Sequence, residues 1–418
     1  MGRRDTLVHR LADWAERKPG APAIHERSED GTWRTYSWAE YWQAVRDTAK
    51  GLIALGHQVG DCVALVGGSR CGWVISQFGI MAARGVPAPI YPNSTADQAA
   101  YIVQHSRCKI AIADTDEQLA KYLKGIEREL MSVKQLIVMD EPDTPNDVVM
   151  SLAALQKLGR QQSDDDLDQR LEDLTINETA LLIYTSGTTG TPKAVQLSNH
   201  NMVSISDALL ACFPRLRSQV PFRIVSYLPL CHVAEQIATN FAQLDTGGQV
   251  FFCADMTQVK DHLTEVRPTV FLGVPRVWEK FQAVLSGRFA EAKPPKSWLA
   301  RWARQTELRC FEEEVRTGKP CMPWSRKLAR KLVISTVKGA LGLDQLALAV
   351  TGAAPISRGT LDFFASLGIV IHEVYGQSET SGILTSARHG RPRFGSVGKA
   401  LDGVQLKIAE DGEILAKG

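Results

Sequence analysis

Two patterns of hydrophobic and polar positions alternate along the first third of the chain. Short apolar runs such as "DCVALVG", "VPAPIYP" and "KQLIVMD" are typical of buried strands. The stretches 70–84, 95–106 and 116–130 have the helical spacing of apolar residues. Strands that alternate with helices in this order predict a mostly parallel sheet covered by helices.

Local signals add detail near the N-terminus. "APAIHERSEDGTWRTYSW" predicts two strands around a turn at Glu29-Asp30-Gly31. Ser37 and Glu40 have the spacing of a capping box, so a helix is expected to begin there and to end near Gly56.

The alternation breaks between Glu141 and Thr179, where polar and acidic stretches predict a surface connection with a helix near 149–158. It then resumes, and the last segment has two alternating strands around Asp411-Gly412, a hairpin signal. The resumed strands are "ALLIYTS", "FRIVSYL", "QVFFCAD", "TVFLGV", "LALAVTG" and "IVIHEVYG", and helices are expected at 199–212, 232–245, 257–264, after Pro275 and at 357–367. We therefore predict an α/β protein with two helix-covered, mostly parallel sheets and a separate hairpin-forming segment at the C-terminal end. The expected subdomains are 1–178, 179–385 and 386–418.

Composition narrows the class of protein. Of 418 residues, 44% are hydrophobic and 22% charged, as in soluble globular proteins. A net charge of +2 gives no overall field that would favour nucleic acid, which we exclude as a partner. No apolar run has the length of a signal peptide or a membrane span, and the eight cysteines form no C-x-x-C pair. We expect a cytoplasmic protein, and its oligomeric state stays open.

One segment, 276–338, is strongly basic. It holds fifteen Lys and Arg against six Glu, and four tryptophans are interleaved. One interpretation is a surface for peripheral contact with an anionic membrane or an acidic partner. The alternative is a set of amphipathic helices whose tryptophans pack inward.

The stretch "YTSGTTGTPKAV", from Tyr184 to Val195, combines hydroxyl side chains, two glycines and a lysine. Such residues bind polyphosphates through backbone amides, hydroxyls and a positive charge. The spacing differs from G-x-x-x-x-G-K-[ST], and Pro192 disfavours helical backbone at Thr191. We therefore predict that the loop joins two strands rather than a strand and a helix.

This stretch resembles the phosphate loop of the adenylate-forming superfamily, which includes acyl-CoA synthetases, peptide-synthetase adenylation domains and luciferases. Further motifs resemble that family in its order: "YLPLCHVAE", "VTGAAPIS", "VYGQSET", "GSVGKALDGVQLKI" and "DGEILAKG". "GVPRVWEKFQ" and "EVYGQSETSG" resemble its long-chain fatty acyl-CoA synthetase branch, in particular the bubblegum-like members.

The resemblance implies ATP-dependent activation of a carboxylic acid, a medium- to long-chain fatty acid in this branch, with ATP, Mg²⁺ and CoA. It implies catalytic roles for His232, Lys193 and Glu379 and a metal site at Thr185 and Glu379. His232 and Gln236 are implied at the acyl group. The implied ATP-binding residues are Thr185, Ser186, Gly187, Thr188, Thr189, Gly190, Lys193, Gly352, Ala353, Ala354, Glu373, Val374, Tyr375, Gly376, Gln377 and Ser378.

The resemblance implies that the last hairpin is the start of a smaller, distorted β-barrel. The family continues beyond this hairpin into a small domain that carries a catalytic lysine. We therefore expect the chain to be the large N-terminal domain alone, incomplete for full turnover. Two alternatives stay open: a fatty acyl-AMP ligase that loads a carrier protein, and a catalytically weak fragment that binds ATP or an acyl group.

Overall fold

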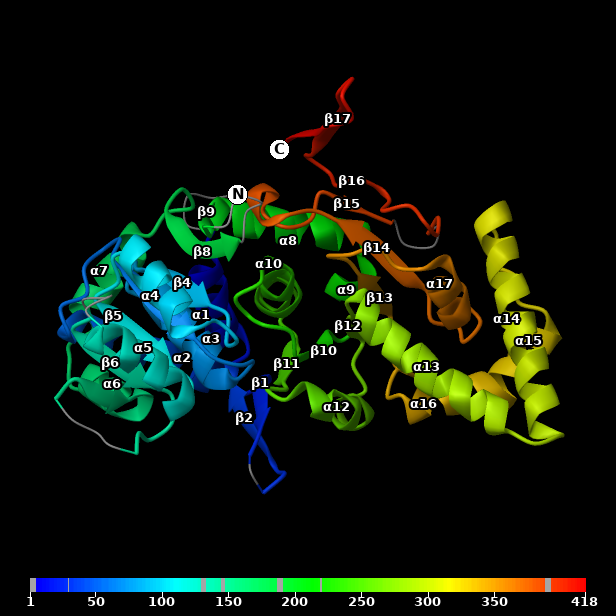
Figure 1. The fold of residues 1–418 in the computed structure, drawn as a ribbon, viewed down its shortest axis with the longest axis horizontal. Helices are drawn as coiled ribbons and strands as arrows, with labels where there is room; N and C mark the ends of the chain where they lie inside the picture. Colours follow the sequence, from blue (N-terminus) through cyan, green and yellow to red (C-terminus); the bar gives the residue numbers. More distant parts are fainter. Residues whose placement is uncertain are drawn as a thin grey trace. The chain divides into compact units, whose positions relative to one another are not determined.

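The computed structural model describes residues 5–28, 30–128, 133–143, 147–185, 191–218, 220–387 and 392–418 (Figure 1). The chain divides into two compact units. The first comprises Met1–Ser206 and Ser226–Met256, and the second comprises Asp207–Val225 and Thr257–Gly418. The subdomain boundaries expected after residues 178 and 385 stay a prediction.

A five-stranded parallel sheet forms the centre of the first unit, in the order β4-β3-β5-β6-β7. Its strands are nearly continuous apolar runs because both faces are covered. The strands are β3 (Cys62–Val66), β4 (Val86–Ile90), β5 (Ile110–Ala113), β6 (Gln135–Val138) and β7 (Val149–Ser151), and the helices are α3 (Cys71–Ala82), α4 (Ala96–His105), α5 (Asp116–Glu127) and α6 (Leu152–Arg160).

The helix predicted near 149–158 begins later than expected. Residues 149–151, expected as helix, form β7 and pair with β6. The helix begins at Leu152 because Ser151 caps it, its hydroxyl accepting from the Ala154 amide at 3.1 Å.

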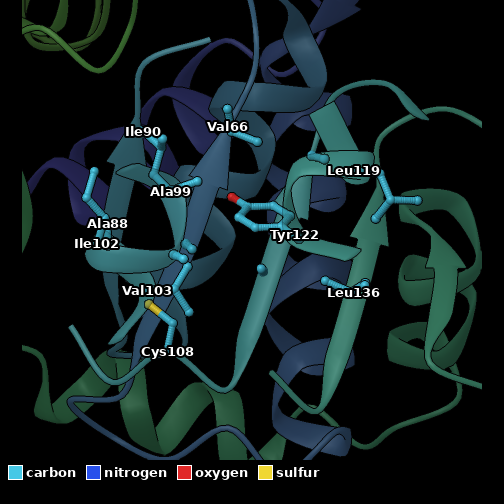
Figure 2. Close-up of a cluster of buried hydrophobic side chains, with 14 of the residues drawn as sticks. Val66, Ala88, Ile90, Ala99, Ile102, Val103, Cys108, Leu119, Tyr122 and Leu136 are labelled. Atoms are coloured by element: carbon cyan, nitrogen blue, oxygen red, sulfur yellow. The ribbon is translucent and has the colours of Figure 1, made fainter. Parts of the chain in front are cut away.

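The core beneath this sheet is shown in Figure 2, where Tyr122 lies among aliphatic side chains that include Val66, Leu119 and Leu136. Leu182 and Tyr184 belong to the same buried cluster. The strand that leads into the predicted phosphate loop is therefore anchored in the core of the first unit.

The rest of the first unit includes the predicted N-terminal hairpin. The capping box is confirmed, with Ser37 and Glu40 each bonding the other's backbone amide. Strand β1 pairs antiparallel with β2 and parallel with β11. The elements are α1 (Leu7–Arg17), β1 (Pro22–Arg27), β2 (Trp33–Ser37), α2 (Trp38–Ala54), α7 (Asp165–Asp173), β8 (Thr179–Thr185), β9 (Lys193–Ser198), α10 (Val233–Glu235), a π-helix (Gln236–Phe241), α11 (Ala242–Thr246), β11 (Gln249–Phe252) and a 3-10 turn (Met256–Gln258) at the unit's end, and α8 (Asn199–Cys212) begins in this unit.

The second unit is built on parallel strands in the order β10-β12-β13-β14, and β15 and β16 continue the sheet antiparallel. The C-terminal hairpin is confirmed by the antiparallel pair β17 and β18. The strands are β10 (Arg223–Ser226), β12 (Val270–Leu272), β13 (Leu348–Thr351), β14 (Ile371–Tyr375), β15 (Thr385–Ser386), β16 (Lys399–Ala400), β17 (Gln405–Ile408) and β18 (Ile414–Lys417). The helices are α9 (Arg215–Ser218), α12 (Val259–Val266), α13 (Pro275–Glu291), α14 (Lys296–Thr317), α15 (Trp324–Ala329), a π-helix (Arg330–Ile334), α16 (Ser335–Ala340), α17 (Arg358–Ala365) and a 3-10 turn (Ser378–Thr380).

The parallel sheets with their covering helices confirm the predicted α/β class. Among the described residues, no helix has the length and apolar character needed to cross a membrane.

Candidate nucleotide and acyl site

Strands β8 and β9 form an antiparallel hairpin that carries the predicted phosphate loop. Thr185 and Lys193 are cross-strand partners, so the structure brings these two predicted site residues together. Ser186, Gly187, Thr188, Thr189 and Gly190 lie outside the described residues. The prediction that the loop joins two strands is confirmed, because Lys193 begins β9 directly after Pro192.

Helix α4 fixes both arms of this hairpin. The Tyr101 hydroxyl donates to the Pro192 carbonyl at 3.0 Å, and Nδ1 of His105 lies 3.0 Å from the Tyr184 hydroxyl. The Tyr101 and His105 rings stack on each other. Burial raises the pKa of Tyr184 to about 12, so its hydroxyl stays protonated. The two ends of the loop are therefore attached to a packed helix through side-chain hydrogen bonds.

His232 lies at the start of α10, half-buried. Its Nδ1 accepts a hydrogen bond from the Ala234 amide at 3.1 Å and so caps the helix. A backbone amide can only donate, so Nδ1 carries no proton here, and the proton of the neutral ring is on Nε2. Burial lowers the pKa of His232, which favours this neutral form. The ring thus has one N–H donor left for an acceptor such as a carboxylate.

Glu235, three residues further, is a buried acid that the sequence reading did not select. Its Oε1 accepts from the Ser226 hydroxyl at 2.6 Å and the Thr239 hydroxyl at 3.0 Å. Burial raises its pKa to about 7, although these bonds and those from the Tyr227 and Leu228 amides act in the opposite direction. The carboxyl group ties the segment between β10 and His232 to the helix that follows. Glu235 is the one acidic residue in the motif "YLPLCHVAE", and this was the available signal.

Gln236 begins a π-helix in place of the continuous helix expected over 232–245. Its side chain is fully buried and exchanges two hydrogen bonds with Gln77 of α3, at 3.0 and 2.7 Å. It also donates to the Leu230 carbonyl and accepts from Asn240. The amide therefore fixes the segment before His232, and its role as an acyl gate stays a prediction.

In the second unit, the predicted adenine segments follow two neighbouring strands. Thr351 pairs with Glu373 across β13 and β14, which brings Gly352 beside Val374. A Cβ on Gly352 would lie 2.9 Å from Cγ2 of Val374. Ala353 has a φ of +67°, the left-handed conformation of a tight turn. Ala353 and Ala354 are exposed, so the turn after β13 offers small side chains and accessible backbone.

Gly376 allows a second close approach. A Cβ there would lie 1.6 Å from the Gly382 carbonyl oxygen, so a side chain cannot be accommodated without moving the backbone. Tyr375, immediately before it, is half-buried at the end of β14. Glu373 accepts from the Gly395 amide at 2.9 Å, and burial raises its pKa.

Ser378 and Glu379 form a short 3-10 turn with Thr380, directly after the exposed Gln377. Glu379 is exposed. The parts of the chain that the structure describes contain no group of three His, Cys, Asp or Glu that could hold a metal ion. A single accessible carboxylate suits Mg²⁺, which binds proteins through one or two carboxylates and takes its remaining ligands from water and phosphate.

A cavity of about 220 Å³ lies elsewhere in the second unit. It is lined by the residues at the start of β13 and β14 and by Phe311, Glu314 and Lys338. The predicted adenine residues follow the other ends of the same strands. This cavity is therefore separate from the predicted nucleotide site.

Comparisons with known proteins agree with the motifs. Residues 11–418 match the family described as AMP-binding enzyme. Long-chain-fatty-acid–CoA ligase ACSBG2 of Xenopus laevis is 34% identical over 98% of this chain, which covers 56% of that protein. Long-chain-fatty-acid–CoA ligase FadD15 of Mycobacterium tuberculosis is 34% identical over 94% of this chain, which covers 64% of that protein. The chain thus spans little more than half the length of the first relatives it matches.

Solved structures share the fold at lower identity. A putative long-chain-fatty-acid CoA ligase from Rhodopseudomonas palustris superposes with a TM-score of 0.68 at 18% identity, covering 99% of this chain and 88% of that one. ATP-bound MatB from the same organism gives a TM-score of 0.69 at 22% identity, covering 100% of this chain and 69% of that one. With nearly its whole length matched, the chain belongs to the AMP-binding enzyme family.

Proposed function

We propose that this chain is the nucleotide- and acyl-binding part of an enzyme that activates a medium- to long-chain fatty acid with ATP. The observation that carries the proposal is the β8–β9 hairpin, which holds Thr185 opposite Lys193 in a chain that is 34% identical to long-chain-fatty-acid–CoA ligases. A loop closed in this way suits a triphosphate because its ends are fixed and its lysine supplies positive charge.

The reaction proceeds in two steps. A carboxylate oxygen of the fatty acid attacks the α-phosphorus of ATP, an acyl–phosphate bond forms, and the bond to pyrophosphate breaks. The sulfur of CoA then attacks the acyl carbonyl, a thioester forms, and AMP leaves with the bonding electrons while the thiol proton goes to solvent. Transfers of this kind depend mainly on positioning and on neutralising charge.

The residues take up distinct parts of this work. Lys193 and the hydroxyls of the loop neutralise and orient the triphosphate. The Nε2–H of His232 donates to a carboxylate oxygen of the acid, supported by the cap that leaves the proton on that nitrogen. Gly352–Ala354 and Tyr375–Gly376 hold adenine at the ends of β13 and β14, supported by the small side chains of the first segment, the aromatic ring of Tyr375, and the close approaches at Gly352 and Gly376.

Magnesium, when bound, neutralises the negative charge of the phosphates. Glu379 would be its carboxylate ligand, supported by its exposure. CoA is the proposed acceptor because both named relatives are CoA ligases. A ligase that loads a carrier protein would use the same adenylation residues. An assay that offers the acyl-adenylate either CoA or a carrier protein would distinguish the two acceptors.

Calorimetry with stable acyl-adenylate mimics of different chain lengths tests the proposal. We expect 1:1 binding of the mimics that strengthens from short to long acyl chains, and binding of ATP with Mg²⁺ that weakens on the order of tenfold in Lys193→Ala. Lys157→Ala, an exposed lysine of α6, is the matched control and should bind like the parent chain. Absence of binding by the folded parent chain, or equal affinity for all chain lengths, would contradict a fatty acyl site.

A further inference from the structure

An exposed apolar stripe runs along the segment formed by α15 and the π-helix after it. Trp324, Leu328 and Leu332 follow one another at intervals of four residues, and their exposed fractions are 75%, 36% and 48%. Spacing of this kind places side chains along one side of a helix. Met322 is also exposed, just before α15.

Lysines flank the stripe. Lys327 and Lys331 are both exposed, each one position before a leucine of the stripe. The surrounding segment 276–338 has nine more Lys and Arg than Glu, fifteen against six. Apolar side chains on a helix beside lysines are the composition of helices that bind the interface of anionic membranes.

The two arginines of α15 and the following π-helix face inward, unlike the lysines. Arg326 and Arg330 both donate to the carboxylate of Glu307 on α14, at 2.8 and 2.6 Å for their Nη2 atoms. Arg326 also reaches Glu314 of α14 at 2.6 Å, and Figure 1 shows α15 beside α14. The segment is thus attached to α14 through its arginines while its lysines and apolar stripe remain accessible.

The four tryptophans of this basic segment divide accordingly. Trp278 is completely buried against Phe271 and Phe364, as the inward-packing alternative expected. Trp302 is half-buried, and Trp298 and Trp324 are exposed. Trp298 is accompanied by the exposed Leu299. Small exposed apolar groups of this kind are common on proteins, so this pair carries no argument. Trp324 differs because three further exposed apolar residues and two lysines accompany it.

We propose that the Trp324 stripe, defined as Met322, Trp324, Leu328 and Leu332 with Lys327 and Lys331, docks on the surface of an anionic lipid bilayer. Tryptophan prefers the headgroup region, leucine and methionine enter the edge of the acyl region, and lysine pairs with lipid phosphates. Charge complementarity selects an anionic bilayer over a neutral one. This inference goes beyond the proposed function, because docking requires neither nucleotide nor acid.

Sedimentation with vesicles tests the proposal, with phosphatidylcholine alone and with phosphatidylcholine containing phosphatidylglycerol. We expect the chain to sediment with the anionic vesicles, to be released by salt, and to bind neutral vesicles weakly. Lys327→Gln with Lys331→Gln should weaken binding on the order of tenfold, as should Trp324→Ala with Leu328→Ala. All these side chains are exposed, and unchanged thermal unfolding would verify the fold of each variant.

Trp298→Ala is the matched control and should bind like the parent chain. Equal binding to neutral and anionic vesicles, or an equal loss in Trp298→Ala and Trp324→Ala, would overturn the assignment. Sedimentation velocity without lipid tests whether a second copy of the chain covers the Trp324 stripe. Self-association abolished by Trp324→Ala, without vesicle binding, would replace the bilayer by a homotypic contact. None of these readouts involves ATP, so failure here leaves the proposed activation reaction standing.

Discussion

Arg326 and Glu307 form an ion pair in which both side chains are almost completely buried, with exposed fractions of 3% and 1% and 2.8 Å between Nη2 and Oε1. Removing one charge from such a pair leaves the other buried without compensation, at a cost of about 3–5 kcal/mol. Glu307→Gln should therefore lower the free energy of unfolding by about that amount, measured by urea denaturation. Glu312→Gln, an exposed glutamate of the same helix, should change it by less than about 0.5 kcal/mol.

The same pair makes stability depend on pH. Burial alone would raise the pKa of Glu307, but Arg330 and Arg326 bring it below its ordinary value of 4.5. A depressed pKa in the folded state contributes stability above the ordinary value that is lost as pH falls below it. The difference in the free energy of unfolding between Glu307→Gln and the parent chain should thus be largest above pH 4.5 and smaller in acid. An unchanged difference across this range would contradict an ionised Glu307.

Glu235 should show the opposite dependence. Its folded pKa of about 7 exceeds the ordinary value of 4.5, so between these values the folded chain holds a proton that the unfolded chain releases. Stability therefore falls as pH rises through this window, by about 3 kcal/mol in total. The free energy of unfolding of Glu235→Gln, measured by urea denaturation, should therefore rise by that amount relative to the parent chain between pH 4 and pH 8. The exposed Glu127→Gln should show no such trend, and a flat difference for Glu235→Gln would mean that the carboxyl titrates normally.

His232 serves two purposes that substitutions can separate. Asparagine offers a side-chain oxygen that can cap α10 in place of Nδ1, but its NH₂ group lies closer to the backbone than Nε2 and does not place a donor at the same point. His232→Asn should keep the melting temperature of the parent chain and lose acyl-adenylate affinity by several-fold to tenfold. His232→Ala should lose the cap as well, about 1 kcal/mol of stability. Full affinity in the asparagine variant would remove His232 from the acyl site.

Gly376 should not tolerate a side chain. Because a Cβ would lie 1.6 Å from the Gly382 carbonyl oxygen, Gly376→Ala forces the backbone to move and should cost at least about 1–3 kcal/mol of stability. Gly359→Ala is the matched control, since the nearest atom to its Cβ is 3.8 Å away and the residue lies in α17. That change should be neutral or stabilise by about 0.5–1 kcal/mol. Comparable melting temperatures for the two variants would contradict the close approach.

Local signals accounted for much of the fold. Ser37 and Glu40 predicted the start of α2, and Pro192 indicated that Lys193 begins a strand. Both are properties of a few adjacent residues, which a sequence displays directly. The strand at 149–151 was missed because its three residues take the strand conformation by pairing with β6. So short a stretch shows no strand pattern of its own.

The candidate site was predictable only where side-chain chemistry is concentrated in a motif. Lys193, His232 and Glu379 were selected in this way. Gln236 pairs with Gln77, a residue more than a hundred positions away in the sequence. Glu235 is enclosed by the folded chain. Neither feature can be seen in a short stretch of sequence. The π-helix over 236–241 likewise follows from tertiary packing, since its residues have an ordinary helical pattern.

The β8–β9 hairpin also has a consequence for the order of folding. Its partners, such as Thr185 and Lys193, are close in sequence, whereas β1 pairs with β11 through Ile24 and Val250. Closing a short loop costs less chain entropy than closing a long one, so pairing of the hairpin requires no prior assembly of the distant strands. We expect pulse-labelled amide exchange to detect protection in β8 and β9 before protection in β1. The frame of the phosphate loop would then exist early in refolding, and later steps would enclose it.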